Sequence, residues 1–223
     1  MSRQLTFDLP VRPALGREDF FIAPSNALAV AALDGGNWPG SKMLLIGPEG
    51  AGKSHLAQVW AGTAGALVLD AEMLGSTLPD PDALVVENAD RIAGDLAAET
   101  SLFHLHNHMQ ARATPLLLTA RSAPAFWGMV LPDLASRLQA TAIATLLPPD
   151  DALLSAVLVK LFADRQLDVP ATLIPWLVTR MDRSFGAARH IVAALDAAAL
   201  ARGGPVTRTL AAELLDSAPD GAA

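Results

Sequence analysis

The stretch Gly47-Pro48-Glu49-Gly50-Ala51-Gly52-Lys53-Ser54 lies between an apolar run at residues 43–46 and a helix-like segment at residues 55–61. A strand, a glycine-rich loop and a helix in this order are typical of a phosphate-binding loop. Small residues let consecutive backbone N–H groups curl around phosphate oxygens at a helix N-terminus, whose dipole favours an anion. The pattern predicts that Lys53 reaches the terminal phosphates of a nucleotide and that the Ser54 hydroxyl ligates Mg²⁺. The alternative interpretation is a surface turn before a capped helix.

The composition is that of a chain able to bury a large core, since 52% of its 223 residues are hydrophobic, with room for a second small domain. No apolar run approaches the roughly 18 residues of a membrane span, and residues 1–10 lack the continuous hydrophobic segment of a signal peptide. We therefore expect a soluble, cytoplasmic protein with no membrane partner. The absence of cysteine excludes disulfides, thiolate metal sites and a cysteine nucleophile.

The formal net charge of −7 argues against a protein that coats nucleic acid by itself. Phosphate binding to DNA or RNA is dominated by clustered lysine and arginine side chains. We therefore expect a protein partner, or DNA held by that partner, so that any contact with DNA is indirect.

Further apolar runs predict short buried strands that alternate with helices, at residues 66–70, 83–87 and 115–119, and another strand at residues 142–147. Strands buried on both faces belong to parallel sheets, so the expected fold class is α/β, with a parallel sheet flanked by helices. Ser25 is the predicted N-cap of a helix over residues 26–33, which together with residues 17–22 would wall a purine.

Polar residues at the ends of these strands are candidate ligands, because open α/β sheets bind their ligands at the carboxyl ends of strands. Glu87 is the predicted Mg²⁺ ligand, and Asp90 ranks below it; the alternative is a strand-end acid exposed to solvent. Thr119, or else Arg121 or Ser122, is predicted to lie near the terminal phosphate.

Three histidines on a predicted helix over residues 95–112 raise the question of a metal site. Only His104 and His108, four residues apart, share a helix face, and no acidic third ligand accompanies them at the spacing of zinc-binding helices. We expect a mixed polar helix face here rather than a metal site.

Pro148 and Pro149 mark the predicted domain boundary, because neither proline fits a helix interior or a central strand. Helical patterns follow at residues 150–165, 170–181, 184–201 and 207–215. The predicted organisation is an extended arm at 1–13, a nucleotide-binding core at 14–148, a helical lid domain at 149–216 and a disordered tail at 217–223.

The stretch Gln4-Leu5-Thr6-Phe7-Asp8-Leu9 is followed by two prolines and predicts an exposed, extended arm. Exposing its three large apolar side chains to water is costly. They are therefore expected either to enter a pocket on a partner or to pack back on their own domain.

A phosphate-loop core followed by a small helical lid is the layout of the AAA+ ATPases. Residues 17–216 resemble the ATPase region of the DnaA-related family, and its Hda-like regulators more closely still. Residues 47–54 match Walker A, and residues 84–88 fall at Walker B. The sensor 1 position is matched by Thr119, the box VII arginine finger by Arg137 in Ser136-Arg137-Leu138, and sensor 2 by Arg189. Walker A alone is shared by many families, whereas the ordered set is much more specific.

The resemblance implies that ADP or ATP binds together with Mg²⁺. The implied nucleotide-binding residues are Gly47, Pro48, Glu49, Gly50, Ala51, Gly52, Lys53, Ser54, His55, Thr119 and Arg189. The implied metal ligands are Ser54 and Glu87.

Two departures from the family pattern concern hydrolysis. Walker B ends in Glu87 where an aspartate is usual, and Asn88 stands where active enzymes carry a water-activating acid. An amide cannot accept a proton, and general-base catalysis contributes about 10²- to 10⁴-fold, so we expect intrinsic hydrolysis to be slow or absent. Arg137, by contrast, is expected to act in trans on a neighbour's nucleotide, the alternative being an ordinary surface arginine.

The resemblance also implies partners. Gln4, Leu5, Phe7 and Leu9 match the hexapeptide with which Hda-like proteins dock on the sliding clamp, the beta subunit of DNA polymerase III. The expected function is stimulation of ATP hydrolysis by the initiator DnaA, which inhibits re-initiation of replication. The rival readings are a helicase-loader or transposition-helper ATPase that acts on DNA, and a scaffold without an active finger. A homo-oligomer is left open.

Overall fold

The computed structural model describes residues 21–75 and 78–217. Five parallel strands form one sheet in the order β2-β3-β4-β1-β5. They are β1 (Lys42–Ile46), β2 (Leu67–Asp70), β3 (Leu84–Glu87), β4 (Leu116–Ala120) and β5 (Ala142–Thr145). In the register of the sheet, Leu45 pairs with Thr119 on one side and with Ala144 on the other. The predicted α/β class with a parallel sheet is confirmed.

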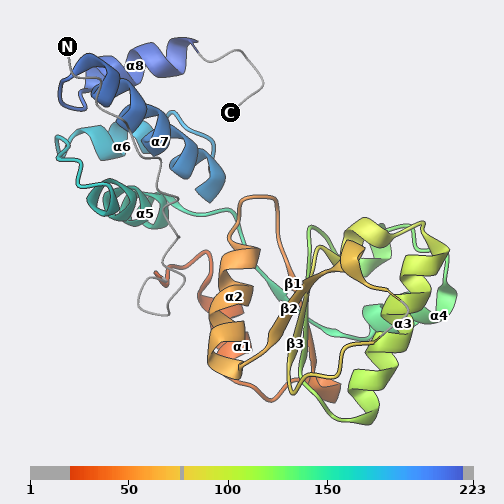
Figure 1. The fold of residues 1–223 in the computed structure, drawn as a ribbon. Coiled ribbons are helices and arrows are strands. Elements are labelled where there is room, and N and C mark those ends of the chain that lie inside the picture. The colour runs from red at the N-terminus through yellow and green to blue at the C-terminus, as the bar shows by residue number, and fades with distance from the viewer. Residues whose placement is uncertain (1–20, 76–77, 218–223) are drawn as a thin grey trace, which may run out of the picture.

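Helices cover both faces of this sheet (Figure 1). One face carries α1 (Ala27–Asp34) and α2 (Lys53–Ala64), and the other carries α3 (Leu96–Ala111) and α4 (Pro132–Gln139). Successive strand residues point to opposite faces, so Leu45 packs with α1 and α2 while Leu44 packs with α3 and α4. Short 3-10 turns complete this part of the chain at η2 (Pro39–Ser41), η3 (Ala71–Met73), η4 (Ala89–Ile92) and η5 (Pro124–Phe126).

The chain beyond Pro149 is helical, as expected. It forms α5 (Asp151–Asp164), α6 (Leu173–Val178), α7 (Phe185–Arg202) and α8 (Arg208–Ser217). These helices share a hydrophobic cluster that includes Leu158, Phe162 and Leu195. Asp150 caps α5 and the Ser184 hydroxyl caps α7, each by accepting a backbone N–H of the first turn. The division of the chain into domains stays a prediction.

Two of the predicted strands lie at the edges of the sheet. β2 and β5 stand at the two ends of the strand order, and Leu67 and Ile143 on them are 42% and 43% exposed. β3 and β4, which lie inside the sheet, bury their apolar residues fully. The prediction that residues 66–70 form a buried strand was wrong in this respect, because burial depends on strand order as well as on apolar composition.

The helix boundaries also required correction at two places. α1 begins at Ala27, with Asn26 at the N-cap position, and Ser25 is not its cap. The carbonyl oxygen of Ser25 instead accepts a hydrogen bond from the N–H of Leu147 at 3.2 Å, which ties the start of α1 to the segment after β5. α6 begins at Leu173, three residues later than predicted, because the chain first makes a turn in which the N–H of Leu173 bonds the carbonyl of Pro170.

Candidate nucleotide-binding site

The glycine-rich loop at residues 47–52 connects β1 to α2 at the carboxyl edge of the sheet (Figure 1). Gly50 has φ 74° and Gly52 has φ 94°, in the left-handed region that favours glycine. Gly52 occupies the N-cap position of α2. The first N–H groups of a helix lack intrahelical partners, so an anion held by this loop would accept them.

Lys53 is the first residue of α2, and its side chain lies across the loop. Its Nζ donates to the carbonyl oxygens of Gly47 at 2.7 Å and Pro48 at 2.9 Å. An ammonium group has three protons, so one remains for a phosphate oxygen. Burial lowers the pKa of Lys53, and the nearby Asp90 carboxylate opposes that effect.

Ser54 and Glu87 could hold the predicted metal ion. Ser54 is exposed in the first turn of α2. Glu87 ends β3, and its Oε1 is buried with no hydrogen-bond partner among the described residues. An unsatisfied carboxylate oxygen suits a hard cation such as Mg²⁺. The described residues include no group of three His, Cys, Asp or Glu side chains that could bind a metal ion alone, so a cation here would also need oxygens of the nucleotide.

Asn88 is fixed by two hydrogen bonds at the ends of neighbouring strands. Its backbone N–H donates to the Thr119 hydroxyl at 3.0 Å, and its Nδ2 donates to the Asp70 carboxylate at 2.6 Å. The structure thus brings Thr119, the predicted sensor, beside the position that would need a general base. The side-chain amide of Asn88 is hydrogen-bonded to Asp70, a residue that sequence reasoning did not identify as part of the site.

Arg121 and Asp90 form an ion pair, with 2.7 Å between Nε and Oδ2. The Asp90 side chain is 7% exposed, whereas that of Arg121 is 59% exposed. Of the acids that raise the pKa of Lys53, Asp90 has the largest effect and Glu87 a smaller one. From the sequence, Asp90 was considered a less probable Mg²⁺ ligand than Glu87. Its position just after β3, two residues beyond Asn88, was the feature that could have indicated its place near Lys53.

The start of α7 packs on the glycine-rich loop, which sequence reasoning missed. The N–H of Phe185 donates to the carbonyl of Gly50 at 3.1 Å. A Cβ at Gly50 would lie 2.4 Å from Cβ of Ser184, and one at Gly52 would lie 2.7 Å from Cε2 of Phe185. No local sequence pattern predicts this contact, because it joins segments that are far apart in the chain.

The remaining predicted ligands are less closely placed. Arg189 is exposed one helical turn after Phe185, so both residues lie on the same side of α7. Its role as a phosphate ligand stays a prediction, as does that of the half-buried His55. The clamp-binding residues Gln4, Leu5, Phe7 and Leu9, and most of the proposed purine wall, lie outside the described residues.

Arg137 is not part of the loop site. It lies in the last turn of α4, which leads into the start of β5 at the opposite edge of the sheet. Its side chain is exposed, and the guanidinium carbon lies 5.1 Å from the centroid of the Phe103 ring. Its predicted role as an arginine finger that acts in trans stays a prediction.

The histidines of α3 do not share one polar face. His108 contacts Asp80, with 2.9 Å between Nε2 and Oδ1, and His104 is exposed. His106 is only 3% exposed. His106 lies on the side of α3 that carries the buried residues Leu102 and Met109 and packs against the sheet.

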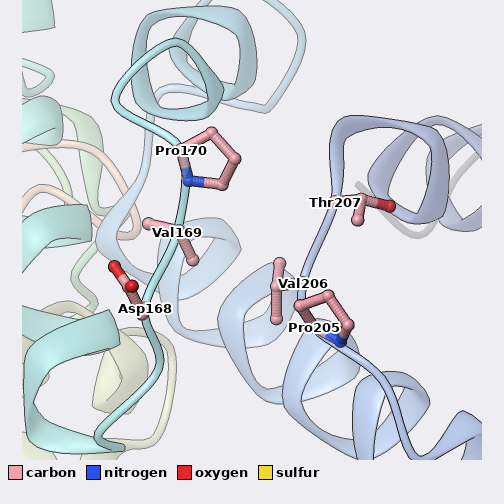
Figure 2. A pocket seen from close by; sticks show the side chains of 6 residues that line it. All are labelled: Asp168, Val169, Pro170, Pro205, Val206 and Thr207. Atoms are coloured by element: carbon pink, nitrogen blue, oxygen red, sulfur yellow. The ribbon is translucent and has the colours of Figure 1, made fainter.

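A cavity of about 330 Å³ lies among the C-terminal helices, away from the loop (Figure 2). Its walls come from the segments between α5 and α6 and between α7 and α8, and comprise Asp168, Val169, Pro170, Pro205, Val206 and Thr207.

None of the helices in the described ranges is long and apolar enough to cross a membrane.

Comparison with known sequences finds a replication initiator among the relatives of this chain. No protein-family model matches the chain. Over 200 residues it is 22% identical to the chromosomal replication initiator protein DnaA of Thermotoga petrophila, and this alignment covers 78% of the chain and 46% of that protein. The chain thus spans about half the length of the curated relative it matches.

Solved structures give a stronger likeness. Domain III of DnaA from Thermotoga maritima matches with a TM-score of 0.82 and 19% identity, over 93% of this chain and 98% of that one. AMPPCP-bound DnaA from Aquifex aeolicus matches with a TM-score of 0.69 and 16% identity, over 82% and 65%. The RuvB Holliday junction branch migration motor of Thermotoga maritima matches with a TM-score of 0.62 and 18% identity, over 86% and 66%. The sequence and structural neighbours of this chain thus include the replication initiator DnaA, and its fold is that of domain III of this initiator.

Proposed function

We propose that this chain binds ADP or ATP with Mg²⁺ in its glycine-rich loop and stimulates ATP hydrolysis by the initiator DnaA through Arg137. The nucleotide holds the core and the C-terminal helices in one orientation. The stimulated hydrolysis converts the initiator to its ADP form and so inhibits re-initiation of chromosomal replication.

The observation that carries the proposal is the position of Arg137. Its exposed guanidinium stacks on Phe103 at the edge of the sheet opposite the loop, so it cannot serve the nucleotide of its own chain. Stacking on a ring holds a guanidinium in one direction while its donors remain free. A cation presented in this way can stabilise the charge that develops on a phosphoryl group bound to a neighbour.

The chain's own site supports binding better than hydrolysis. The free proton of Lys53, the N–H groups at the start of α2, and the Ser54 hydroxyl suit phosphate and Mg²⁺. When bound, Mg²⁺ neutralises phosphate charge. Asn88, tied to Asp70 at 2.6 Å, offers no base to a water molecule. The neighbour AMPPCP-bound DnaA is a nucleotide complex, which supports an adenine nucleotide as the ligand here.

Residues 4–9 supply the second part of the proposal. Gln4, Leu5, Phe7 and Leu9 dock on the sliding clamp as an extended peptide with alternate anchors. Tethering raises the effective concentration of the chain near initiator bound to the same DNA. Because the clamp is loaded on DNA that is being replicated, the initiator would hydrolyse its ATP only after replication has begun.

The test mixes the protein with clamp-loaded DNA and ATP-bound DnaA and follows ADP formation. We expect wild-type protein to stimulate hydrolysis, Arg137→Ala to abolish stimulation, and Arg112→Ala to leave it unchanged. Arg112 is a matched control because it is an exposed arginine at the end of α3 that pairs with Asp80. Phe7→Ala should require far more protein for the same rate. No stimulation by wild type, or full stimulation by Arg137→Ala, contradicts the proposal.

A further inference from the structure

A group of three basic side chains lies at the amino edge of the sheet, opposite the glycine-rich loop. We call Lys42, His106 and Arg137 the basal cluster. Lys42 is the first residue of β1, His106 lies on α3, and Arg137 lies in the last turn of α4. The proposed function uses only Arg137.

Lys42 is a buried cation. It is 4% exposed, and its Nζ donates to Oε1 of Gln110 on α3 at 2.9 Å. Burial, and then the charge of Arg137, lower the pKa of Lys42 to about 8. The group is therefore mostly charged at neutral pH, although burying an ammonium without a counter-ion is costly.

His106 cannot supply the counter-charge. It is 3% exposed, and neither ring nitrogen has a hydrogen-bond partner within the described residues. Burial, with the charges of Lys42 and Arg137, lowers its pKa to about 4, so the ring is neutral at neutral pH.

The basal cluster also lacks a carboxylate. Six other basic side chains pair with acids, in Arg112–Asp80, Arg121–Asp90, Lys160–Asp164, Arg165–Asp196, Arg183–Asp151 and Arg202–Glu213. In the described ranges no such ion pair involves Lys42 or Arg137, although the protein carries a formal charge of −7. Two neighbouring cations without an acid attract an anion from another molecule.

We propose that Arg137 binds a phosphoryl group presented by a partner protein, and that Lys42 acts through Arg137 by adding its positive charge to the site. Arg137, which is exposed, makes the contact. The residue after Lys42, Met43, pairs with Ala142 of β5, and the Thr141 hydroxyl donates to the carbonyl oxygen of Arg137, so the start of β1 lies beside the end of α4. From this buried position the charge of Lys42 adds to the positive field around the guanidinium. This inference rests on the proposed function, in which the phosphoryl group is that of ATP on the initiator.

A purely structural role for Lys42, linking β1 to Gln110 of α3, is the competing explanation. The two differ in what they predict for the reaction. A structural role changes stability, or the amount of protein needed for half-maximal stimulation. An electrostatic role changes the maximal rate and vanishes when Lys42 loses its proton.

The experiment measures ADP formation by ATP-bound initiator on clamp-loaded DNA, with wild type, Lys42→Met, Lys42→Arg and Lys160→Met. Lys160→Met is the control, because it removes a lysine of α5 that pairs with Asp164. We expect Lys42→Met to lower the maximal rate roughly tenfold, with the half-saturating concentration unchanged. Lys42→Arg should keep most of the rate.

The pH dependence is the more specific measurement. The groups that face Lys42 are His106 of α3, which is neutral from pH 7 upward, and Arg137 of α4, which stays charged. Between pH 7 and 9 only Lys42 in this cluster titrates. The ratio of the wild-type rate to the Lys42→Met rate should fall toward one, whereas Lys42→Arg should keep its advantage over Lys42→Met.

The outcomes separate the two proposals. No stimulation by wild type overturns the proposed function itself. Stimulation that Arg137→Ala abolishes and Lys42→Met leaves intact overturns only the inference, as does a loss with Lys42→Met whose size does not change with pH. Should Lys42→Met fail to fold, a Lys42→Arg rate that declines with pH as steeply as that of wild type overturns the inference too.

Discussion

The N–H of Phe185 donates to the carbonyl oxygen of Gly50, with 3.1 Å between nitrogen and oxygen. This bond joins the first residue of α7 to the middle of the glycine-rich loop. Beside it, Ser184 and Phe185 occupy the space that side chains at Gly50 and Gly52 would need. The conformation of the loop and the position of α7 are therefore coupled, so a nucleotide that orders one should order the other.

Gly50→Ala should weaken nucleotide binding by disturbing this coupling. The substitution forces alanine to φ 74° and brings its Cβ to 2.4 Å from Ser184. Gly65→Ala is the matched control, because Gly65 has φ 64° and no atom within 4 Å of an added Cβ. Both variants should lose about 1–2 kcal/mol to backbone strain, and only Gly50→Ala should also lose nucleotide affinity. Titration with a fluorescent adenine nucleotide measures the difference.

A second substitution identifies the source of that loss. Adding Ser184→Gly to Gly50→Ala removes the colliding Cβ, at a cost of a few tenths of a kcal/mol for the weaker helix cap. The double variant should regain part of the nucleotide affinity. If it binds no better than Gly50→Ala alone, the contact with α7 is not the cause.

Lys53→Met should abolish stabilisation by nucleotide. A ligand at 100 times its Kd stabilises a folded protein by about 2.7 kcal/mol, so ADP should raise the free energy of unfolding of wild type by that order. In the variant, the bonds to Gly47 and Pro48 and the contact to phosphate are lost. Urea unfolding with and without ADP measures the effect. Lys160→Met should respond to ADP like wild type, and a normal response from Lys53→Met would refute the assignment.

Glu99→Leu should destabilise the fold strongly. Its carboxylate is fully buried and accepts backbone N–H groups from Gly94, Val130 and Leu131, the last at 2.7 Å. These bonds hold the segment that leads into α4 and Arg137. Removing the carboxylate leaves three backbone donors without their partner and puts an apolar side chain among them, which should cost about 3–5 kcal/mol.

Urea unfolding checks this value against a control at the surface. Glu213→Leu removes an exposed acid that pairs with Arg202 and should cost no more than about 1 kcal/mol. Equal losses in the two variants would show that Glu99 does not anchor α4.

His106 should make stability fall in acid. Burial lowers the pKa of His106 from 6.5 to about 4, so between these values the unfolded chain binds a proton that the folded protein does not. Its contribution is complete above pH 6.5 and is lost as pH falls toward 4, by a total on the order of 3 kcal/mol. The difference in free energy of unfolding between pH 7 and 4.5 should be smaller in His106→Leu than in wild type. If this difference were the same in both proteins, a group other than His106 would be responsible for the loss of stability in acid.

Local patterns in the sequence were sufficient for much of the fold. The loop at residues 47–54 combines left-handed backbone positions with glycine, and the alternation of apolar runs and helices requires a parallel sheet with helices on both faces. Helices were predicted to start at Asp95 and Asp150, and these two residues are the N-caps of α3 and α5. These features depend on residues close together in the chain, which is why they could be predicted.

Long-range packing decided the rest. The order of the strands placed β2 and β5 at the edges of the sheet. The packing of α3 and α4 on the sheet buried His106 and left Lys42 near Arg137 without an acidic partner. It also placed Phe185 on a loop more than a hundred residues earlier in the chain. Burial and charge pairing depend on which segments meet in space, and hydrophobic period, turn residues and caps report only on a residue's neighbours along the chain.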